Sequence, residues 1–156
     1  ERAKKAGIPI FLLTKKECPD PIEFDGKISA QLKENAIDYI ALAGYMRILT
    51  HGFVGEYRGR ILNIHPALLP SFKGAHAIED AFEYGVKVTG VTVHLVDEGV
   101  DTGPIVMQEA TRIKESDTLA SLEERIHAIE HRVYPEAIDK IINGKVKQDN
   151  RKVRIV

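Results

Sequence analysis

The sequence predicts an α/β fold, in which helices pack around a mostly parallel sheet. Three observations support this prediction. Short apolar runs of strand length alternate with segments whose apolar residues recur every three or four positions. Two runs rich in β-branched residues follow in the second half, and a long amphipathic segment comes after them. We therefore expect a Rossmann-like wound sheet with an antiparallel strand pair and a long helix toward the C-terminus.

The first half of the chain predicts alternating helices and strands. It opens on a charged, helix-favouring segment that Gly7 closes, and Pro9 in the next apolar run favours a strand start or a sheet edge. Ile28, Leu32 and Ala36 lie four residues apart, as on one face of a helix. In order, we expect a strand at 8–13, a helix around 28–36, a buried strand at 38–44, a helix at 46–57, a strand at 60–65 and a helix at 75–84.

The second half predicts an antiparallel pair and then a long helix. Residues 88–96 and 105–113 alternate with β-branched side chains on either side of a Gly-containing loop. The helix is predicted by an apolar stripe that consists of Leu119, Leu122, Ile126, Ile129, Val133, Ala137 and Ile141. Its N-cap candidates are Ser116, Asp117 and Thr118, and Pro135 is expected to bend it. Residues 145–156 are expected to form a final edge strand pair.

Composition narrows the class of protein. The 156 residues are 44% hydrophobic, which suits one globular domain with a buried core. The 22 basic and 23 acidic side chains nearly balance, so we expect neither nucleic acid nor a membrane surface as a partner. The lone Cys18 cannot form an internal disulfide, and no apolar run approaches the ~18 residues of a membrane span. A cytoplasmic protein, monomeric or homodimeric, is expected.

The first candidate site lies at the end of the strand predicted at 60–65. Asn63 and His65 are two positions apart, so their side chains share one face of the strand while Ile64 turns to the other. Ligands of open α/β sheets bind beyond the carboxyl ends of the strands. An amide and an imidazole there could stabilise an oxyanion during acyl transfer. Polar residues that only cap a strand end are the alternative interpretation.

The second candidate site is the loop from Val96 to Pro104, which holds three acidic residues and two glycines. A solvated turn is the ordinary interpretation of such a loop. For Asp101 we expect a chemical role as well. A carboxylate near an imidazole favours the imidazolium and can relay a proton from an ammonium-like tetrahedral intermediate.

Three segments of the chain resemble motifs of the formyltetrahydrofolate-dependent formyltransferase family. They are Ala43-Gly44-Tyr45-Met46-Arg47-Ile48-Leu49, Leu62-Asn63-Ile64-His65-Pro66 with the Leu-Leu-Pro that follows, and the loop from Asp97 to Pro104. Their order and intervals match as well, and the resemblance covers nearly the whole chain. It implies transfer of a formyl group from 10-formyltetrahydrofolate to the amine of glycinamide ribonucleotide in de novo purine biosynthesis, without a metal.

Residue by residue, the resemblance implies a catalytic trio of Asn63, His65 and Asp101. Protonated His65 and the Asn63 amide would stabilise the oxyanion. Asp101 would assist proton transfer from the attacking nitrogen to the folate, in part through a water. The implied folate pocket consists of Met46, Arg47, Ile48, Leu49, Val96, Asp97, Glu98 and Val100. The resemblance also implies that the ribonucleotide binds at Gly44, Pro66 and Glu130.

The chain departs from the family's pattern at its N-terminus. The family's first strand and its Gly-Ser-Asn phosphate-binding loop have no counterpart in this sequence. Backbone amides of that loop would hold the phosphate of the substrate. We therefore expect residues 1–156 to be a single catalytic domain that is N-terminally incomplete, or one that receives the missing strands from another polypeptide.

Several other functions stay open as alternatives. A methionyl-tRNA formyltransferase would carry a further nucleic-acid-binding domain, and a formyltetrahydrofolate hydrolase would carry a second His where this chain has Pro66. From another class, a folate-binding module without turnover is conceivable. His127 and His131 are four residues apart on one helix, but the zinc-protease pattern fails there and we expect a polar helix edge. His94 is expected to be a satisfied His within a strand.

Overall fold

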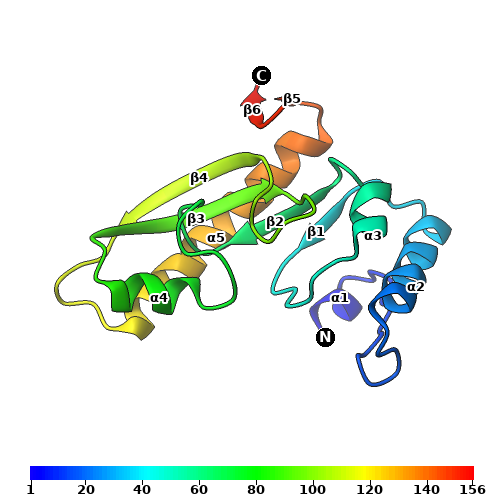
Figure 1. The fold of residues 1–156 in the computed structure, drawn as a ribbon, viewed down its shortest axis with the longest axis horizontal. Helices are drawn as coiled ribbons and strands as arrows, with labels where there is room; N and C mark the ends of the chain where they lie inside the picture. The colour runs from blue at the N-terminus through cyan, green and yellow to red at the C-terminus, as the bar shows by residue number, and fades with distance from the viewer.

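Six strands form one mixed sheet in the computed structural model of residues 1–156 (Figure 1). They are β1 (Ile40–Leu42), β2 (Ile61–His65), β3 (Val88–Leu95), β4 (Ile105–Arg112), β5 (Val146–Asp149) and β6 (Lys152–Ile155), in the spatial order β1-β2-β3-β4-β6-β5. β1 pairs parallel with β2 and β4 with β6, whereas β2 with β3, β3 with β4 and β5 with β6 are antiparallel. It follows that β1, β2, β4 and β6 run in one direction and β3 and β5 in the other.

Five helices surround the sheet: α1 (Arg2–Lys5), α2 (Pro21–Glu34), α3 (His51–Glu56), α4 (Ala77–Tyr84) and α5 (Leu119–Ile142). The first three gather at the β1 end of the sheet, whereas α5 crosses behind the central strands (Figure 1). The predicted fold class is confirmed, including the antiparallel pair β3–β4, the long helix and the terminal strand pair. None of the helices has the length and apolar character needed to cross a membrane.

The hydrophobic core lies between α5 and the central strands. Thr118 begins the helix through a reciprocal cap, in which its hydroxyl accepts from the Ser121 N–H and the Ser121 hydroxyl accepts from the Thr118 N–H. The predicted apolar stripe of α5 is buried from Leu122 to Ile141. One cluster includes Leu122, Ile126 and Val133 of α5 together with Val91, Val93 and Leu95 of β3. Packing against the sheet therefore holds α5 in place.

The opposite face of β3 is covered by the loop that follows β2. On this face Thr92 is fully buried, and its hydroxyl donates to the Ala67 carbonyl at 2.7 Å and accepts from the Leu69 N–H at 3.1 Å. The Gln108 amide on β4 donates to the same hydroxyl and to the Leu69 carbonyl, both at 3.0 Å. This buried polar network fixes the start of the loop, so its later residues reach the end of β2 in a defined position.

Two of the predicted strands need correction. Residues 8–13 form no strand, because Pro9 offers no N–H and no ladder joins the segment to another strand. Their apolar side chains are exposed instead, Leu12 by 80%. The strand predicted as buried at 38–44 is shorter, and Ala41 is exposed because β1 forms an edge of the sheet.

The helix predicted at 46–57 is wrong over its first five residues. α3 begins at His51, where the Thr50 hydroxyl accepts from the Phe53 N–H and so caps the helix. Residues 43–50 form an irregular loop, and Gly44 adopts a left-handed backbone conformation with φ of 61°. This loop leaves β1 toward the carboxyl end of β2.

Tyr134 ties α5 to two adjacent parallel strands, which yields a stability prediction. Its hydroxyl donates to the carbonyls of Leu42 at 2.7 Å and Leu62 at 3.1 Å, and burial raises its pKa, so it stays a donor. We expect Tyr134→Phe to lower the free energy of unfolding by about 1–3 kcal/mol, because buried carbonyls lose their donor. Urea unfolding measures this. Tyr84→Phe, at a tyrosine that is 81% exposed, is the control, and equal losses in both variants would contradict the prediction.

Candidate active site

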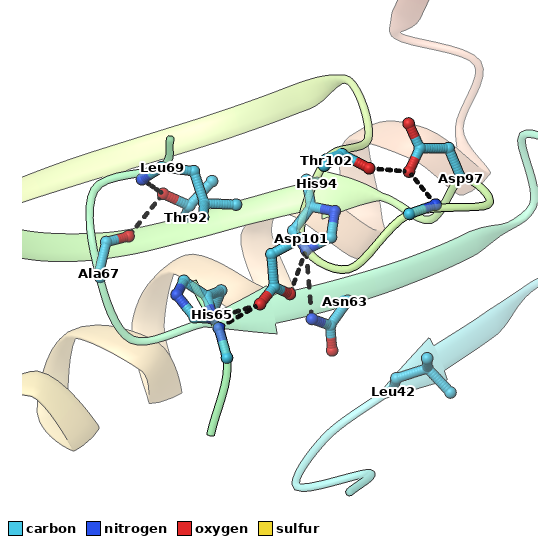
Figure 2. A network of polar contacts seen from close by, with 12 residues as sticks. Leu42, Asn63, His65, Ala67, Leu69, Thr92, His94, Asp97, Asp101 and Thr102 are labelled. Atoms are coloured by element: carbon cyan, nitrogen blue, oxygen red, sulfur yellow. Dashed lines mark hydrogen bonds and ion pairs between the residues drawn. The ribbon is translucent and has the colours of Figure 1, made fainter. Parts of the chain in front are cut away.

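Four polar side chains converge beyond the carboxyl end of β2 (Figure 2). Asn63 and His65 come from β2, His94 comes from β3, and Asp101 comes from the loop between β3 and β4. The antiparallel register places Asn63 directly opposite His94. The structure thus brings the three residues expected to form the trio into one cluster and adds His94 as a fourth.

His65 is buried and both of its ring nitrogens face oxygen atoms. Nε2 lies 2.7 Å from the carbonyl oxygen of Phe72, and Nδ1 lies 3.5 Å from Oδ2 of Asp101. A carbonyl oxygen only accepts, so Nε2 carries a proton. A proton on Nδ1 as well would face the carboxylate, and the imidazolium satisfies both contacts. A hydrogen bond from His65 to a ligand requires one of these contacts to open, and the contact with Asp101 is the longer.

His94 is held as a neutral imidazole. Its Nδ1 donates to the Leu95 carbonyl at 2.9 Å, so Nε2 is free to accept from the Asn63 amide nitrogen at 3.2 Å. Burial is the main cause that lowers the pKa of His94, and the charge of Asp101 opposes it only in part. The Asn63 amide has two N–H groups, so one remains for a ligand while the other orients the side chain against His94.

Asp101 is aimed at the two histidines by its loop. Its Oδ2 accepts from the Gly74 N–H at 2.8 Å, its Oδ1 lies 3.6 Å from Nε2 of His94, and its backbone φ of 50° is in the left-handed region. Asp97 closes the loop by accepting from the Thr102 hydroxyl at 2.5 Å. At Gly103 a Cβ would lie 1.7 Å from the Leu95 carbonyl oxygen, so only glycine lets the loop turn back this closely.

The cluster forms one wall of a cavity of about 930 Å³. A second wall is the irregular loop after β1, where Met46 and Ile48 are 72% and 77% exposed and offer apolar surface to a ligand. The residues expected to bind folate or the ribonucleotide all line this cavity: Gly44, Met46, Arg47, Ile48, Leu49, Pro66, Val96, Asp97, Glu98, Val100 and Glu130. Volume and lining suit a small organic molecule with a polar reacting end.

Two of these residues have contacts that the sequence did not suggest. Arg47 lies in a loop and not near a helix start, and its guanidinium stacks 3.8 Å above the ring centroid of Phe24. Glu130 on α5 accepts from Nδ1 of His127 at 2.8 Å. His127 and His131 both line the cavity, and no three His, Cys, Asp or Glu side chains in the structure are grouped so that they could hold a metal ion.

The place of His94 in the cluster was not predicted. His94 is a satisfied His within a strand, as expected, but its link to Asn63 was not foreseen. No motif indicates this link, because it depends on the antiparallel pairing of β2 with β3, which places His94 opposite Asn63. The backbone groups of Phe72 and Gly74 carry no sequence signal, because any residue type supplies them.

Comparison with known proteins agrees with this geometry. Residues 1–138 match the formyl transferase family. The chain is 47% identical over 142 residues to phosphoribosylglycinamide formyltransferase of Bacillus subtilis (strain 168), covering 91% of this chain and 73% of that protein. It is 48% identical over 147 residues to the human trifunctional purine biosynthetic protein adenosine-3, covering 94% of this chain but only 15% of that protein.

A solved structure has the same fold. Glycinamide ribonucleotide transformylase 1 from Symbiobacterium toebii superposes with a TM-score of 0.95 at 43% sequence identity, covering 99% of this chain and 73% of that chain. These matches in sequence and in structure each cover more than nine tenths of this chain. The chain belongs to the formyl transferase family.

Proposed function

We propose that this chain carries the active site of a phosphoribosylglycinamide formyltransferase, which moves a formyl group from 10-formyltetrahydrofolate to the amine of glycinamide ribonucleotide. The main observation behind the proposal is the cluster of Asn63, His65 and Asp101 at the carboxyl end of β2. It lies in a cavity large enough for the formyl group of the folate and the amine of the ribonucleotide to meet. The family and the names of the relatives support the same activity. We also propose that residues 1–156 belong to one catalytic domain, because one sheet joins both walls of the cavity.

The reaction needs an oxyanion to be stabilised and one proton to be moved. The amine nitrogen attacks the formyl carbon, and the carbonyl oxygen becomes an oxyanion. The free N–H of Asn63 is positioned to donate to that oxygen, and protonated His65 contributes positive charge close by. The bond from the formyl carbon to the folate nitrogen then breaks. The attacking nitrogen loses a proton and the folate nitrogen gains one, so tetrahydrofolate leaves and the formylated amine remains.

Asp101 is the group best placed to move this proton. Its carboxylate faces both histidines and is held by the Gly74 N–H, so it keeps one orientation while a proton passes. It can accept the proton from the attacking nitrogen directly or through a water, and return it to the folate nitrogen.

The two ligands are assigned to different walls of the cavity. The loop from Met46 to Leu49 and the loop from Val96 to Asp101 together suit a flat ring system with polar edges, as in a pterin. Gly44, Pro66 and Glu130 are assigned to the ribonucleotide, and the Glu130 carboxylate on α5 can accept from ribose hydroxyls. A cytoplasmic location and the lack of a nucleic acid partner stay predictions.

An assay of the released products tests the proposed function. We expect tetrahydrofolate to appear only when glycinamide ribonucleotide is present, together with an equal amount of formylated ribonucleotide. Release of tetrahydrofolate and formate at the same rate without the ribonucleotide would identify a hydrolase instead. Binding of folate without either product would identify a binding module.

Removal of the charge of Asp101 tests its proton role. We expect Asp101→Asn to lower kcat at least ~100-fold while the Kd for 5,8-dideazafolate changes little, because the amide keeps the shape of the loop but cannot accept the proton. Steady-state kinetics and calorimetric titration measure the two quantities. Asp80→Asn, at an exposed carboxylate on α4, is the control. Near-normal turnover of Asp101→Asn would rule out this role.

Removal of the Asn63 amide tests oxyanion stabilisation. We expect Asn63→Ala to cost about 2.7–4 kcal/mol in the transition state, seen as a loss of kcat, because the donor acts only when the oxyanion forms. A loss confined to KM would instead assign Asn63 to substrate positioning.

A further inference from the structure

Asp25 on α2 is a buried carboxylate that formyl transfer does not use. Asp25 is only 4% exposed to solvent, and its Oδ2 accepts a hydrogen bond from the backbone N–H of Thr50 at 2.7 Å. A carboxylate is costly to bury unless hydrogen bonds compensate for lost water. This contact is made across 25 residues of sequence, to the last residue of the loop that forms one wall of the cavity.

The preceding residue of α2 holds the same loop at a second point. Phe24 is also 4% exposed, and the guanidinium of Arg47 lies 3.8 Å from its ring centroid. The charges of Asp25 and Arg47 also affect Tyr45. Burial raises the pKa of Tyr45, Asp25 adds to that rise, and Arg47 opposes it. Two consecutive residues of α2 therefore contact the loop from outside the cavity.

The loop has few other means of keeping its shape. Residues 43–50 form neither helix nor strand, and Met46 and Ile48 at its centre are mostly exposed. Thr50 is the point at which the loop becomes regular again, because its hydroxyl caps α3 and its carbonyl accepts from the Val54 N–H at 3.0 Å. A change in the position of Thr50 would move the end of the loop and the start of α3 together.

We propose that Phe24 and Asp25 are positioning residues that hold the loop from Tyr45 to Thr50 in the shape that receives the folate. The proposal rests on the proposed function, since it takes this loop to be the folate-facing wall. Asp25 sets the end of the loop through its hydrogen bond to Thr50, and Phe24 sets the backbone near Arg47 by stacking. Neither side chain lines the cavity itself, so their effect on a ligand passes through the loop.

Calorimetric titration with 5,8-dideazafolate tests the proposal. We expect Asp25→Ala to raise the Kd at least about tenfold, because a hydrogen bond to a charged group holds the loop. Asp25→Asn should recover most of the affinity, since its amide oxygen can still accept from Thr50. Glu23→Gln is the matched control, because Glu23 is a carboxylate on the same helix that forms only an exposed ion pair with Lys27. Wild-type affinity in a folded Asp25→Ala variant would overturn the proposal.

Hydrogen exchange of the loop amides separates this proposal from the proposed function. We expect the amide of Thr50 and those of Phe53 and Val54, which bond to Thr50, to exchange faster in Asp25→Ala than in the wild type, while α5 keeps its protection. Unchanged exchange at Phe53 and Val54 would overturn the positioning role. If Asp25→Ala does not fold, Phe24→Leu replaces it in both measurements, with the same expected and contradicting results. If the wild type does not bind the folate analogue, the proposed function fails, and loop exchange alone decides the role of Asp25.

Discussion

The antiparallel pairing of β2 with β3 runs from Leu62 opposite Leu95 to His65 opposite Thr92, and the site depends on this register. It places Asn63 against His94 and directs His65 to the same edge. A shift of one residue would turn Asn63 and His65 to the face of the sheet that packs on α5. The same register also ends β3 where Gly103 can pass the Leu95 carbonyl, so the returning loop carries Asp101 to the histidines.

The two walls of the cavity are held by different means. The wall with Asn63 and His65 belongs to the sheet, and the buried Thr92 and Gln108 network fixes the loop behind it. The opposite wall is an irregular loop at the sheet edge, which depends on side chains of α2. Tyr134 joins the two systems, because its hydroxyl on α5 donates to the carbonyl at the end of β1 and to a carbonyl near the start of β2. Of the proposed catalytic groups, Asn63 and His65 thus lie on a strand and Asp101 on a returning loop, whereas the proposed folate-facing loop depends on α2.

The spacing of residues along the sequence was enough to predict the structural features that depend on periodicity. The stripe of α5, the antiparallel pair β3–β4, and the shared face of Asn63 and His65 follow from residue spacing, and the structure contains each. The failures occurred where tertiary contacts decide the outcome. Residues 8–13 are apolar enough for a strand but lack a partner, and residues 46–50 have helical character but lie before the Thr50 cap.

Contacts between distant segments could not be read from the sequence either. Family motifs indicated the residues of the trio, but the acceptor for Nε2 of His65 is the carbonyl of Phe72, which no side chain reveals. Likewise Asp25 appeared only as one charged residue in an amphipathic helix, because its partner is a backbone N–H 25 residues away. Pairings of this kind depend on how the loops pack, which spacing does not describe.

The closed loop at Asp97 has a consequence for the thermodynamics of ligand binding. Asp97 accepts from both the Gly99 N–H and the Thr102 hydroxyl, and Arg151 donates to the Thr102 carbonyl from the terminal hairpin. These bonds restrict the backbone of the loop before any ligand arrives, so most of its conformational entropy is already lost when the chain folds. Ligand binding therefore costs little further conformational entropy in this loop. More of the favourable contact enthalpy then contributes to the free energy of binding.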